Sequence, residues 1–240
     1  TKEHERRLVL FDAHAIIHRA YHALTEFATK QGEPTGGLYG LSTMLMRAIA
    51  EFAPDYMAAC YDLPAPTFRH QEYKAYKATR AKTDDALKHQ LERSREVFEA
   101  FHIPIYDARG FEADDMLGTI VEQLKEAPGL EILIVTGDMD TLQLVSGKRV
   151  RVYTLKKGIN DTVVYDEAQV MERFGFAPLQ LPDYKGLRGD PSDNIIGIAG
   201  IGEKTGSELI QKFGTIEGIY RVAKEGGAEA LVAAGVKARI

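Results

Sequence analysis

Short apolar runs alternate with amphipathic stretches through the first two-thirds of the chain. The runs are four to six residues long and rich in Val, Ile, Leu and Tyr, which is typical of buried strands. They are Leu8–Phe11, Met57–Tyr61, Ile103–Tyr106, Glu131–Thr136, Arg149–Tyr153 and Thr162–Tyr165. The stretches between them have a helical period and are His14–Phe27, Leu38–Phe52, Asp85–Phe101, Glu112–Lys125 and Asp138–Val145. This alternation predicts an α/β fold, with a mostly parallel central sheet and helices on both faces.

Two regions break the alternation. Residues 63–83 are polar and basic, contain Pro64 and Pro66, and show no clear period. A connection of this length usually marks a functional or mobile segment. After about Glu167 the chain becomes helical, with glycines between short helices. We therefore expect an α/β core over residues 1–166, including 63–83, and a helical subdomain over residues 167–240.

The composition is that of an ordinary globular protein, with 45% hydrophobic and 27% charged residues. No apolar run reaches the ~20 residues that a bilayer span needs, and the N-terminal residues do not resemble a secretory signal. A single cysteine, Cys60, cannot form an internal disulfide, so we expect a reducing, cytoplasmic location and no membrane partner.

The net charge of −5 argues against a nucleic-acid partner, since binding to phosphates needs cations. The placement of the acids changes this conclusion. Nine of the 35 acids are candidates for one site, and without them 26 acids face 30 basic residues, a balance of +4. A basic surface around an acidic, metal-filled site is compatible with DNA.

Acidic residues follow several of the predicted strands. In open α/β sheets, ligands bind outside the carboxyl ends of the strands. Asp12, Asp62 and Asp138 each come directly after a strand or its terminal glycine, and the other candidates lie on nearby turns or first helical turns. The full set is Asp12, Asp62, Glu112, Asp114, Asp115, Asp138, Asp140, Asp190 and Asp193.

Each acid alone has a structural explanation, because Asp is common in turns and acids complement the first turn of a helix. Together they would repel each other, and burying them unpaired would be costly. Divalent cations remove that cost, and ligation by oxygen alone favours Mg²⁺ or Mn²⁺ over zinc. His14, His18 and His22, spaced i, i+4, i+8, could be a zinc site, but no fourth ligand is suggested by spacing. We expect a packing or solvent-facing stripe, with His14 at the mouth of the acidic site.

A series of short motifs runs through the chain. They are Leu10-Phe11-Asp12, Tyr61-Asp62, Thr67-Phe68-Arg69-His70, Tyr76-Lys77-Ala78-Thr79-Arg80, Glu112-Ala113-Asp114-Asp115, Thr136-Gly137-Asp138-Met139-Asp140, Gly189–Asn194 and Gly200-Ile201-Gly202-Glu203-Lys204-Thr205. In this order and spacing the chain resembles, over nearly its whole length, the 5′ nuclease (flap endonuclease) family, in particular the N-terminal 5′→3′ exonuclease domain of bacterial DNA polymerase I.

The resemblance implies a PIN-like fold, two or more Mg²⁺ ions (Mn²⁺ is an alternative) and hydrolysis of DNA phosphodiester bonds. The first ion would be held by Asp12, Asp62, Glu112, Asp114 and Asp115, and the second by Asp138, Asp140, Asp190 and Asp193. The substrates implied are DNA with a 5′ flap, a nick or a free 5′ end, cut in primer removal and repair. The resemblance also implies that the protein is a monomer associated with the nucleoid, and that it acts with a fused or partner polymerase.

The resemblance also implies DNA contacts. Residues 63–83 would form an arch through which the 5′ strand passes, with Lys77 and Arg80 at the scissile phosphate and Tyr76 either stacked on a base or packed within the arch. A helix–three-turn–helix element over about residues 185–214 would grip duplex DNA and could hold K⁺. The other implied contacts are Arg19, Arg69, His70, Gly200, Gly202, Lys204 and Thr205.

Two other functions remain open at this point. A ribonuclease of the PIN-like fold would share the acidic set, although the arch and the Gly200–Thr205 turn argue against it. A non-catalytic DNA-binding module of a polymerase would not need the complete set of nine acids.

Overall fold

The computed structural model describes residues 5–157 and 161–233. The chain divides into two compact units. The first unit comprises Thr1–Phe68 and Lys82–Asp166, and the second comprises Arg69–Ala81 and Glu167–Ile240. Each unit is described by itself.

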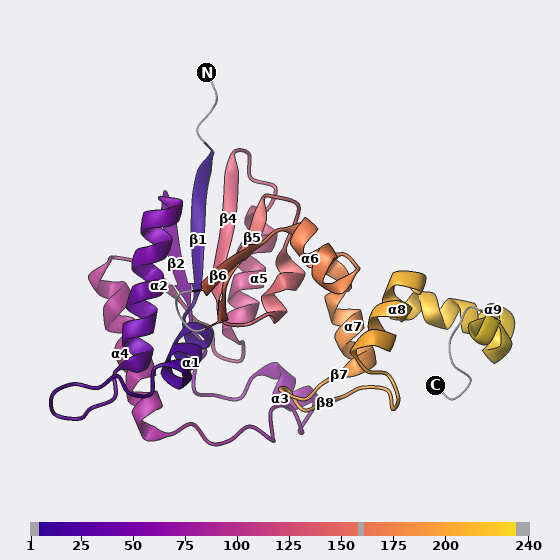
Figure 1. The fold of residues 1–240 in the computed structure, drawn as a ribbon, viewed down its shortest axis with the longest axis horizontal. Coiled ribbons are helices and arrows are strands. Elements are labelled where there is room, and N and C mark those ends of the chain that lie inside the picture. Colours follow the sequence, from indigo (N-terminus) through magenta and orange to yellow (C-terminus); the bar gives the residue numbers. More distant parts are fainter. Residues whose placement is uncertain (1–4, 158–160, 234–240) are drawn as a thin grey trace. The chain divides into compact units, whose positions relative to one another are not determined.

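A six-stranded sheet organises the first unit (Figure 1). Its strands are β1 (Arg6–Asp12), β2 (Tyr56–Cys60), β3 (Ile105–Tyr106), β4 (Leu130–Thr136), β5 (Val150–Lys157) and β6 (Asp161–Tyr165), in the order β3-β2-β1-β4-β5-β6. Neighbours from β3 to β5 pair in parallel, and β6 pairs antiparallel with β5. The parallel arrangement brings the carboxyl ends of β1, β2 and β4 to one edge.

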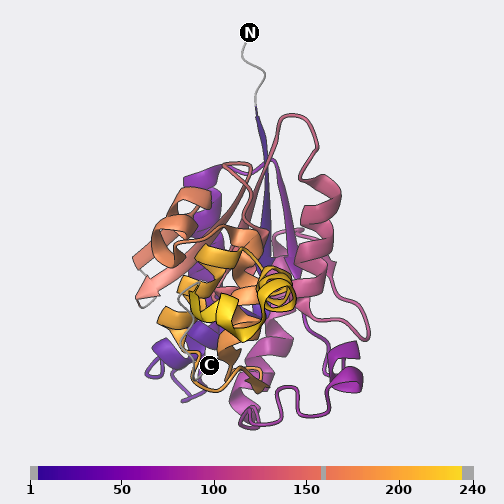
Figure 2. The same cartoon turned by 90° about the vertical axis from the view of Figure 1, so that its right-hand side faces the viewer.

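Helices cover both faces of this sheet. The helices of the first unit are α1 (Ala13–Ala23), α2 (Gly36–Phe52), α4 (Asp85–Ala100) and α5 (Ala113–Leu124), with a short 3₁₀ helix η1 (Asp140–Leu144). Val9 and Phe11 of β1 pack into one core with α1, α2 and α4. Successive strand residues point to opposite faces, and α5 lies on the other side of the sheet from α2 (Figure 2). The expected mostly parallel sheet with helices on both faces is confirmed.

Three predicted elements are shorter than expected by more than one residue at an end. The helix predicted over His14–Phe27 ends at Ala23, because the backbone of Phe27 accepts a hydrogen bond from Thr35 and belongs to a turn. The strand predicted over Ile103–Tyr106 pairs only at Ile105–Tyr106. The helix predicted over Asp138–Val145 is the 3₁₀ helix η1, which begins at Asp140.

The second unit is mainly helical. Its elements are α6 (Glu167–Phe174), η2 (Pro178–Gln180), α7 (Leu181–Arg188), β7 (Gly189–Asp190), β8 (Ile195–Ile196), α8 (Glu203–Phe213) and α9 (Ile216–Ala233). Phe176 and Tyr184 pack with ring centroids 5.1 Å apart in its core. Gly189 and Gly197 let the β7–β8 hairpin close, because a Cβ on Gly197 would lie 2.2 Å from the Gly189 nitrogen.

Residues 69–81 group with this helical unit, whereas the expected division placed all of residues 63–83 in the α/β core. The physical reason is a set of hydrogen bonds to residues 192–194. The short helix α3 (Phe68–Glu72) stands at the start of this segment. In the part of the chain that the structure describes, no helix is both long and apolar enough to span a bilayer.

Candidate metal centre and nucleic-acid interface

Asp12 lies at the carboxyl end of β1, where the chain turns directly into α1. One carboxylate oxygen caps α1 by accepting the Ala15 N–H at 3.1 Å. The other accepts the Thr136 hydroxyl at 2.6 Å. The residue is only 3% exposed, so both oxygens are fixed in a largely dry environment.

Asp138 and Asp140 follow β4 and are oriented by the same strand end. The Thr136 hydroxyl oxygen accepts the Asp138 N–H at 2.9 Å, and the Asp138 carboxylate accepts the Asp140 N–H at 2.9 Å. Gly137 permits this turn to approach α1, because a Cβ there would lie 2.5 Å from the Ala15 carbonyl oxygen. The turn thus places its acids beside the helix that Asp12 caps.

Asp62 and the acids at the start of α5 meet at the next strand end. The Asp62 carboxylate accepts the Ala113 N–H of α5 at 2.7 Å. Asp115 accepts the Glu112 N–H at 2.9 Å, and Glu112 accepts the Thr67 hydroxyl at 3.4 Å. Glu112 and Asp115 therefore serve the start of α5 as a reciprocal cap.

The carboxylates of the first unit form one electrostatic cluster. Burial, together with the charges of Asp138 and Asp62, raises the pKa of Asp12 to about 7, although the Thr136 and Ala15 hydrogen bonds oppose this. Burial also raises the pKa of Asp114 well above 3.8, and the charges of Asp12, Asp138, Asp62 and Asp140 act in the same direction. Five like charges that destabilise one another are what a bound divalent cation would relieve.

The zinc alternative finds no support in the structure. His14 is partly buried, with its ring edge-on to Tyr61 at 5.4 Å, and burial lowers the pKa of its imidazole. The rings of His18 and His22 are 6.4 Å apart, and His22 is exposed. Within residues 5–157 and 161–233, the three histidines do not form a group close enough to share an ion.

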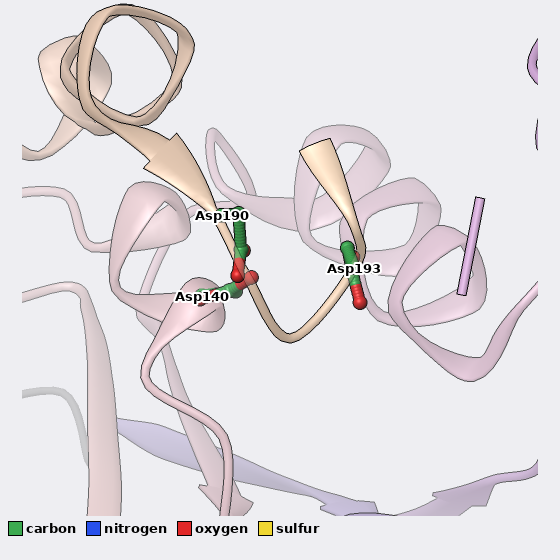
Figure 3. Close-up of side chains that lie close together, drawn as sticks. All are labelled: Asp140, Asp190 and Asp193. Atoms are coloured by element: carbon green, nitrogen blue, oxygen red, sulfur yellow. The ribbon is translucent and has the colours of Figure 1, made fainter. Parts of the chain in front are cut away.

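In the second unit, Asp190 ends β7 and Asp193 lies on the turn that joins β7 to β8, while Asp140 opens η1 of the first unit (Figure 3). Asp190 is 6% exposed and pairs with Lys185 at 2.7 Å. Burial alone would raise the pKa of Asp190, but hydrogen bonds from Lys185 and Ser192 lower it to about 2. Asp190 is therefore held ionised by its own unit.

The candidate cations at residues 69–81 are tied to the same turn. Arg80 pairs with Asp193 at 2.7 Å. Lys77 has a φ of 55°, which interrupts helical geometry, so Lys77 and Arg80 do not lie on one continuous helical face. Tyr76 is 6% exposed and contacts the His70 ring and the Lys77 ammonium, which favours packing within this segment over an exposed stacking platform. Arg69 lies beside His70 in α3.

The remaining predicted DNA contacts lie in both units. The guanidinium of Arg19 donates to the carbonyl oxygens of Gly137 and Lys156, each at 3.2 Å. Gly200 has a φ of 88°, Gly202 is the N-cap of α8, and Lys204 and Thr205 lie in the first turn of that helix. Gly202 has no side chain with which to cap α8, and the backbone amides of the first turn of this helix are suited to a phosphate.

Sequence reasoning missed two groups that orient the acids. Thr136 bridges Asp12 and Asp138, and Lys185 neutralises Asp190. A hydroxyl residue at the buried end of β4 was a signal that could have indicated the first. The sequence indicates the role of Lys185 only weakly, because a lysine five residues before an acid is a common arrangement.

Comparison with known proteins supports the same family along the whole chain. Residues 7–175 match the model of the 5′-3′ exonuclease N-terminal resolvase-like domain, and residues 176–239 match that of the 5′-3′ exonuclease C-terminal SAM fold. DNA polymerase I of Caldicellulosiruptor bescii is 41% identical over 217 residues, covering 90% of this chain and 25% of the polymerase. DNA polymerase I of Chloroflexus aurantiacus is 43% identical over 216 residues, covering 88% and 23%.

Solved structures show the same fold. The bacteriophage T5 D15 flap endonuclease, in a pseudo-enzyme–product complex with DNA and metal ions, superposes with a TM-score of 0.71 at 22% identity, covering 90% of this chain and 78% of that one. The chain spans about a quarter of the length of the polymerases that it matches. Its two matched regions follow each other without a gap, and together they identify the chain as a member of the 5′-3′ exonuclease family.

Proposed function

We propose that this chain is a divalent-metal-dependent 5′ nuclease that hydrolyses DNA at 5′ flaps, nicks and free 5′ ends. The observation that carries the proposal is the cluster of five carboxylates in the first unit, where burial and mutual repulsion raise the pKa of Asp12 and Asp114. Family membership supplies the reaction class, and the T5 enzyme with the same fold binds DNA and metal ions.

The donor set fits hard divalent ions. Every candidate ligand is a carboxylate, and Mg²⁺ and Mn²⁺ prefer oxygen ligands. In the first unit the candidates for direct contact are Asp12, Asp62, Asp114, Asp138 and Asp140, and Glu112 and Asp115 would act through water. When bound, such ions supply an activated water and stabilise charge on the leaving oxygen. Asp190 and Asp193 stay a prediction for the second ion.

The chain's own groups hold this site in shape. Thr136 and the Ala15 N–H fix the two oxygens of Asp12, so an ion meets a preorganised ligand. Lys77 and Arg80 would neutralise the scissile phosphate, with Arg69 and His70 beside them. Arg19 would contact a further phosphate, and the Gly200–Thr205 turn would bind the duplex backbone, with K⁺ held by its carbonyl oxygens.

The biological setting follows from the relatives. The matched relatives are polymerases about four times as long as this chain, so we propose that the nuclease acts with a fused or partner polymerase in primer removal and repair. We also propose that the chain is a monomer that acts at the nucleoid in the cytoplasm.

The proposal is tested with Asp138→Asn on an end-labelled 5′-flap duplex. We expect Mg²⁺-dependent cleavage to fall by about 100-fold or more, because the neutral amide is a weaker ligand than the carboxylate and does not offset the charge of the ion. Flap binding in Ca²⁺ should survive. The control is Asp85→Asn, which makes the same charge change on a side chain that is 97% exposed and pairs with Lys88 on the surface of α4.

Each rival function predicts another result. A non-catalytic module would process no flap in the wild type, and Asp138→Asn would change nothing. A ribonuclease would cut structured RNA in preference to the flap. Full cleavage by Asp138→Asn would refute the metal assignment.

A further inference from the structure

Residues 69–81, called here the strap, are docked on the loop of residues 190–194 by main-chain contacts in the second unit. The Lys77 N–H donates to the Asp193 carbonyl oxygen at 3.0 Å. The Asn194 side-chain amide donates to the Ala75 carbonyl oxygen at 2.7 Å, and the Tyr73 hydroxyl donates to the Asn194 carbonyl oxygen at 3.1 Å. These three bonds join segments more than 110 residues apart in the chain.

Side chains of the strap meet Asp193 on the same loop. The Tyr76 hydroxyl donates to one carboxylate oxygen of Asp193 at 3.1 Å, and Arg80 donates to the other at 2.7 Å. Arg80 also donates through Nε to the Ser192 carbonyl oxygen at 3.1 Å. These bonds fix the position of the strap along the loop. They place Arg80, a proposed phosphate contact, beside Asp193, a proposed ligand of the second metal ion.

Asn194 is the residue on which this register depends. Its φ of 58° is in the left-handed region, which Asn tolerates better than other non-glycine residues. In this conformation Asn194 makes two hydrogen bonds to the strap. Its side-chain amide donates to the Ala75 carbonyl oxygen, and its own carbonyl oxygen accepts from the Tyr73 hydroxyl. The pairing of β7 with β8 holds the loop in place.

We propose that Tyr73 and Asn194 are positioning residues, which fix the strap on the 190–194 loop and thereby set where Lys77 and Arg80 act. The docking stands on the geometry alone, and its effect on cleavage rests on the proposed function. Neither residue needs to touch DNA or metal. Tyr73 is 40% exposed, so its hydroxyl bond can be removed with little disturbance of the core.

Amide hydrogen exchange measures the docking directly, because the Lys77 N–H is bonded across the interface between strap and loop. The test compares Tyr73→Phe, which removes one bond, with Asn194→Gly, which removes the side-chain bond but keeps the left-handed backbone accessible. Exchange at Lys77 should accelerate about fivefold in each, which corresponds to about 1 kcal/mol. Asn194→Ala should have a larger effect, because it adds backbone strain.

The control for the tyrosine variant is Tyr220→Phe. Tyr220 lies in α9 of the same unit and is 64% exposed. The Tyr220→Phe substitution should leave amide exchange at Lys77 unchanged. Equal exchange at Lys77 in wild type, Tyr73→Phe and Asn194→Gly would overturn the proposal.

Flap cleavage then separates positioning from a general loss of structure. With the strap displaced, kcat on a 5′ flap should fall about tenfold in Tyr73→Phe and Asn194→Gly. The flap affinity in Ca²⁺ and the Tm of both variants should stay close to those of the control Tyr220→Phe. Parallel losses of kcat, affinity and Tm would mean a structural role and would overturn the proposal. A wild type that cuts no flap would refute the proposed function, yet the exchange measurements would still decide the docking.

Discussion

One hydroxyl, that of Thr136, serves two candidate metal ligands. It donates to Asp12 and accepts from the backbone of Asp138, so the ends of β1 and β4 share a fixed point. Partners of this kind behind a metal ligand typically change metal affinity by 10- to 100-fold when removed. The geometry of single residues therefore sets how well the acidic cluster is prepared for an ion.

Replacement of Thr136 by Val should weaken Mn²⁺ binding to the DNA-free protein by about 10-fold or more, because it leaves the Asp138 N–H without its acceptor and frees Asp12 to rotate. Thr136→Ser keeps the hydroxyl and should bind like the wild type. Electron paramagnetic resonance of free Mn²⁺ measures both. Equal affinity of the Val and Ser variants would contradict this role.

The acidic cluster also makes metal-free stability depend on pH. The pKa of Asp12 is raised from 3.8 to about 7, so the stability linked to its protonated form is present at low pH and is lost as pH rises through about 7. The Tm in chelator should therefore fall as pH rises from about 4, where Asp12 of the unfolded chain ionises, to about 7, and level off above that.

Two further measurements isolate the cause. Asp12→Asn should flatten the fall in Tm, because the amide does not ionise. Mg²⁺ should raise the Tm of the wild type more at about pH 8 than at about pH 6.5, since carboxylates bind the ion in their ionised form. A Tm that rises with pH in chelator would exclude a buried, destabilised carboxylate cluster.

At the scale of elements, the β4–η1 turn and α1 must approach closely for the acids to converge. Gly137 makes this possible, because a Cβ there would meet the Ala15 carbonyl oxygen of α1 at 2.5 Å. Gly118, in the interior of α5, lies in a roomier place, because the nearest atom to a Cβ there is a Leu144 methyl at 3.8 Å. Alanine substitutions at these two glycines therefore measure how much stability depends on the close approach of the turn to α1.

We expect Gly137→Ala to lower the free energy of unfolding by about 1–3 kcal/mol, because the new Cβ displaces the α1 backbone. Gly118→Ala should raise it by up to about 1 kcal/mol, as alanine favours a helix interior. Urea unfolding of the metal-free protein gives both values. Equal effects from the two substitutions would mean that Gly137 is not a contact point.

At the scale of the whole molecule, charge determines how a protein with a net charge of −5 can approach DNA. The acids gather at strand ends and on one hairpin, while the proposed phosphate contacts lie on the strap, α1 and the first turn of α8. Metal ions would neutralise much of the acidic set. Basic groups then govern the affinity for phosphate, which depends on salt.

Replacement of Lys204 by Ala should weaken flap binding in Ca²⁺ and reduce the slope of log K against log[salt] by about 1, with kcat at saturating DNA unchanged. Lys212→Ala is the control, because Lys212 lies in the last turn of the same helix and approaches the Phe213 ring. Fluorescence anisotropy at several KCl concentrations gives the slopes. An unchanged slope for Lys204→Ala would remove this lysine from the interface.

The sequence by itself determined the alternation of strands and helices, the sheet type, the family and the identity of the acids at the strand ends. These follow from local patterns: side-chain periods of two and 3.6, and motifs within a few residues. The extent of the helix after Asp12 was not encoded in this way, because a backbone hydrogen bond from Thr35 to Phe27 draws that part of the chain into a turn. At the start of η1, the Asp138 carboxylate accepts the Asp140 N–H and competes with regular helical hydrogen bonding.

Only the tertiary structure decided that Thr136 links Asp12 to Asp138, and that the strap docks on the 190–194 loop with Arg80 and Tyr76 at Asp193. Each of these arrangements depends on at least one contact between residues more than 100 positions apart. Such contacts form when the chain buries its apolar faces and the remaining polar groups must find partners. No local pattern specifies which partners they find.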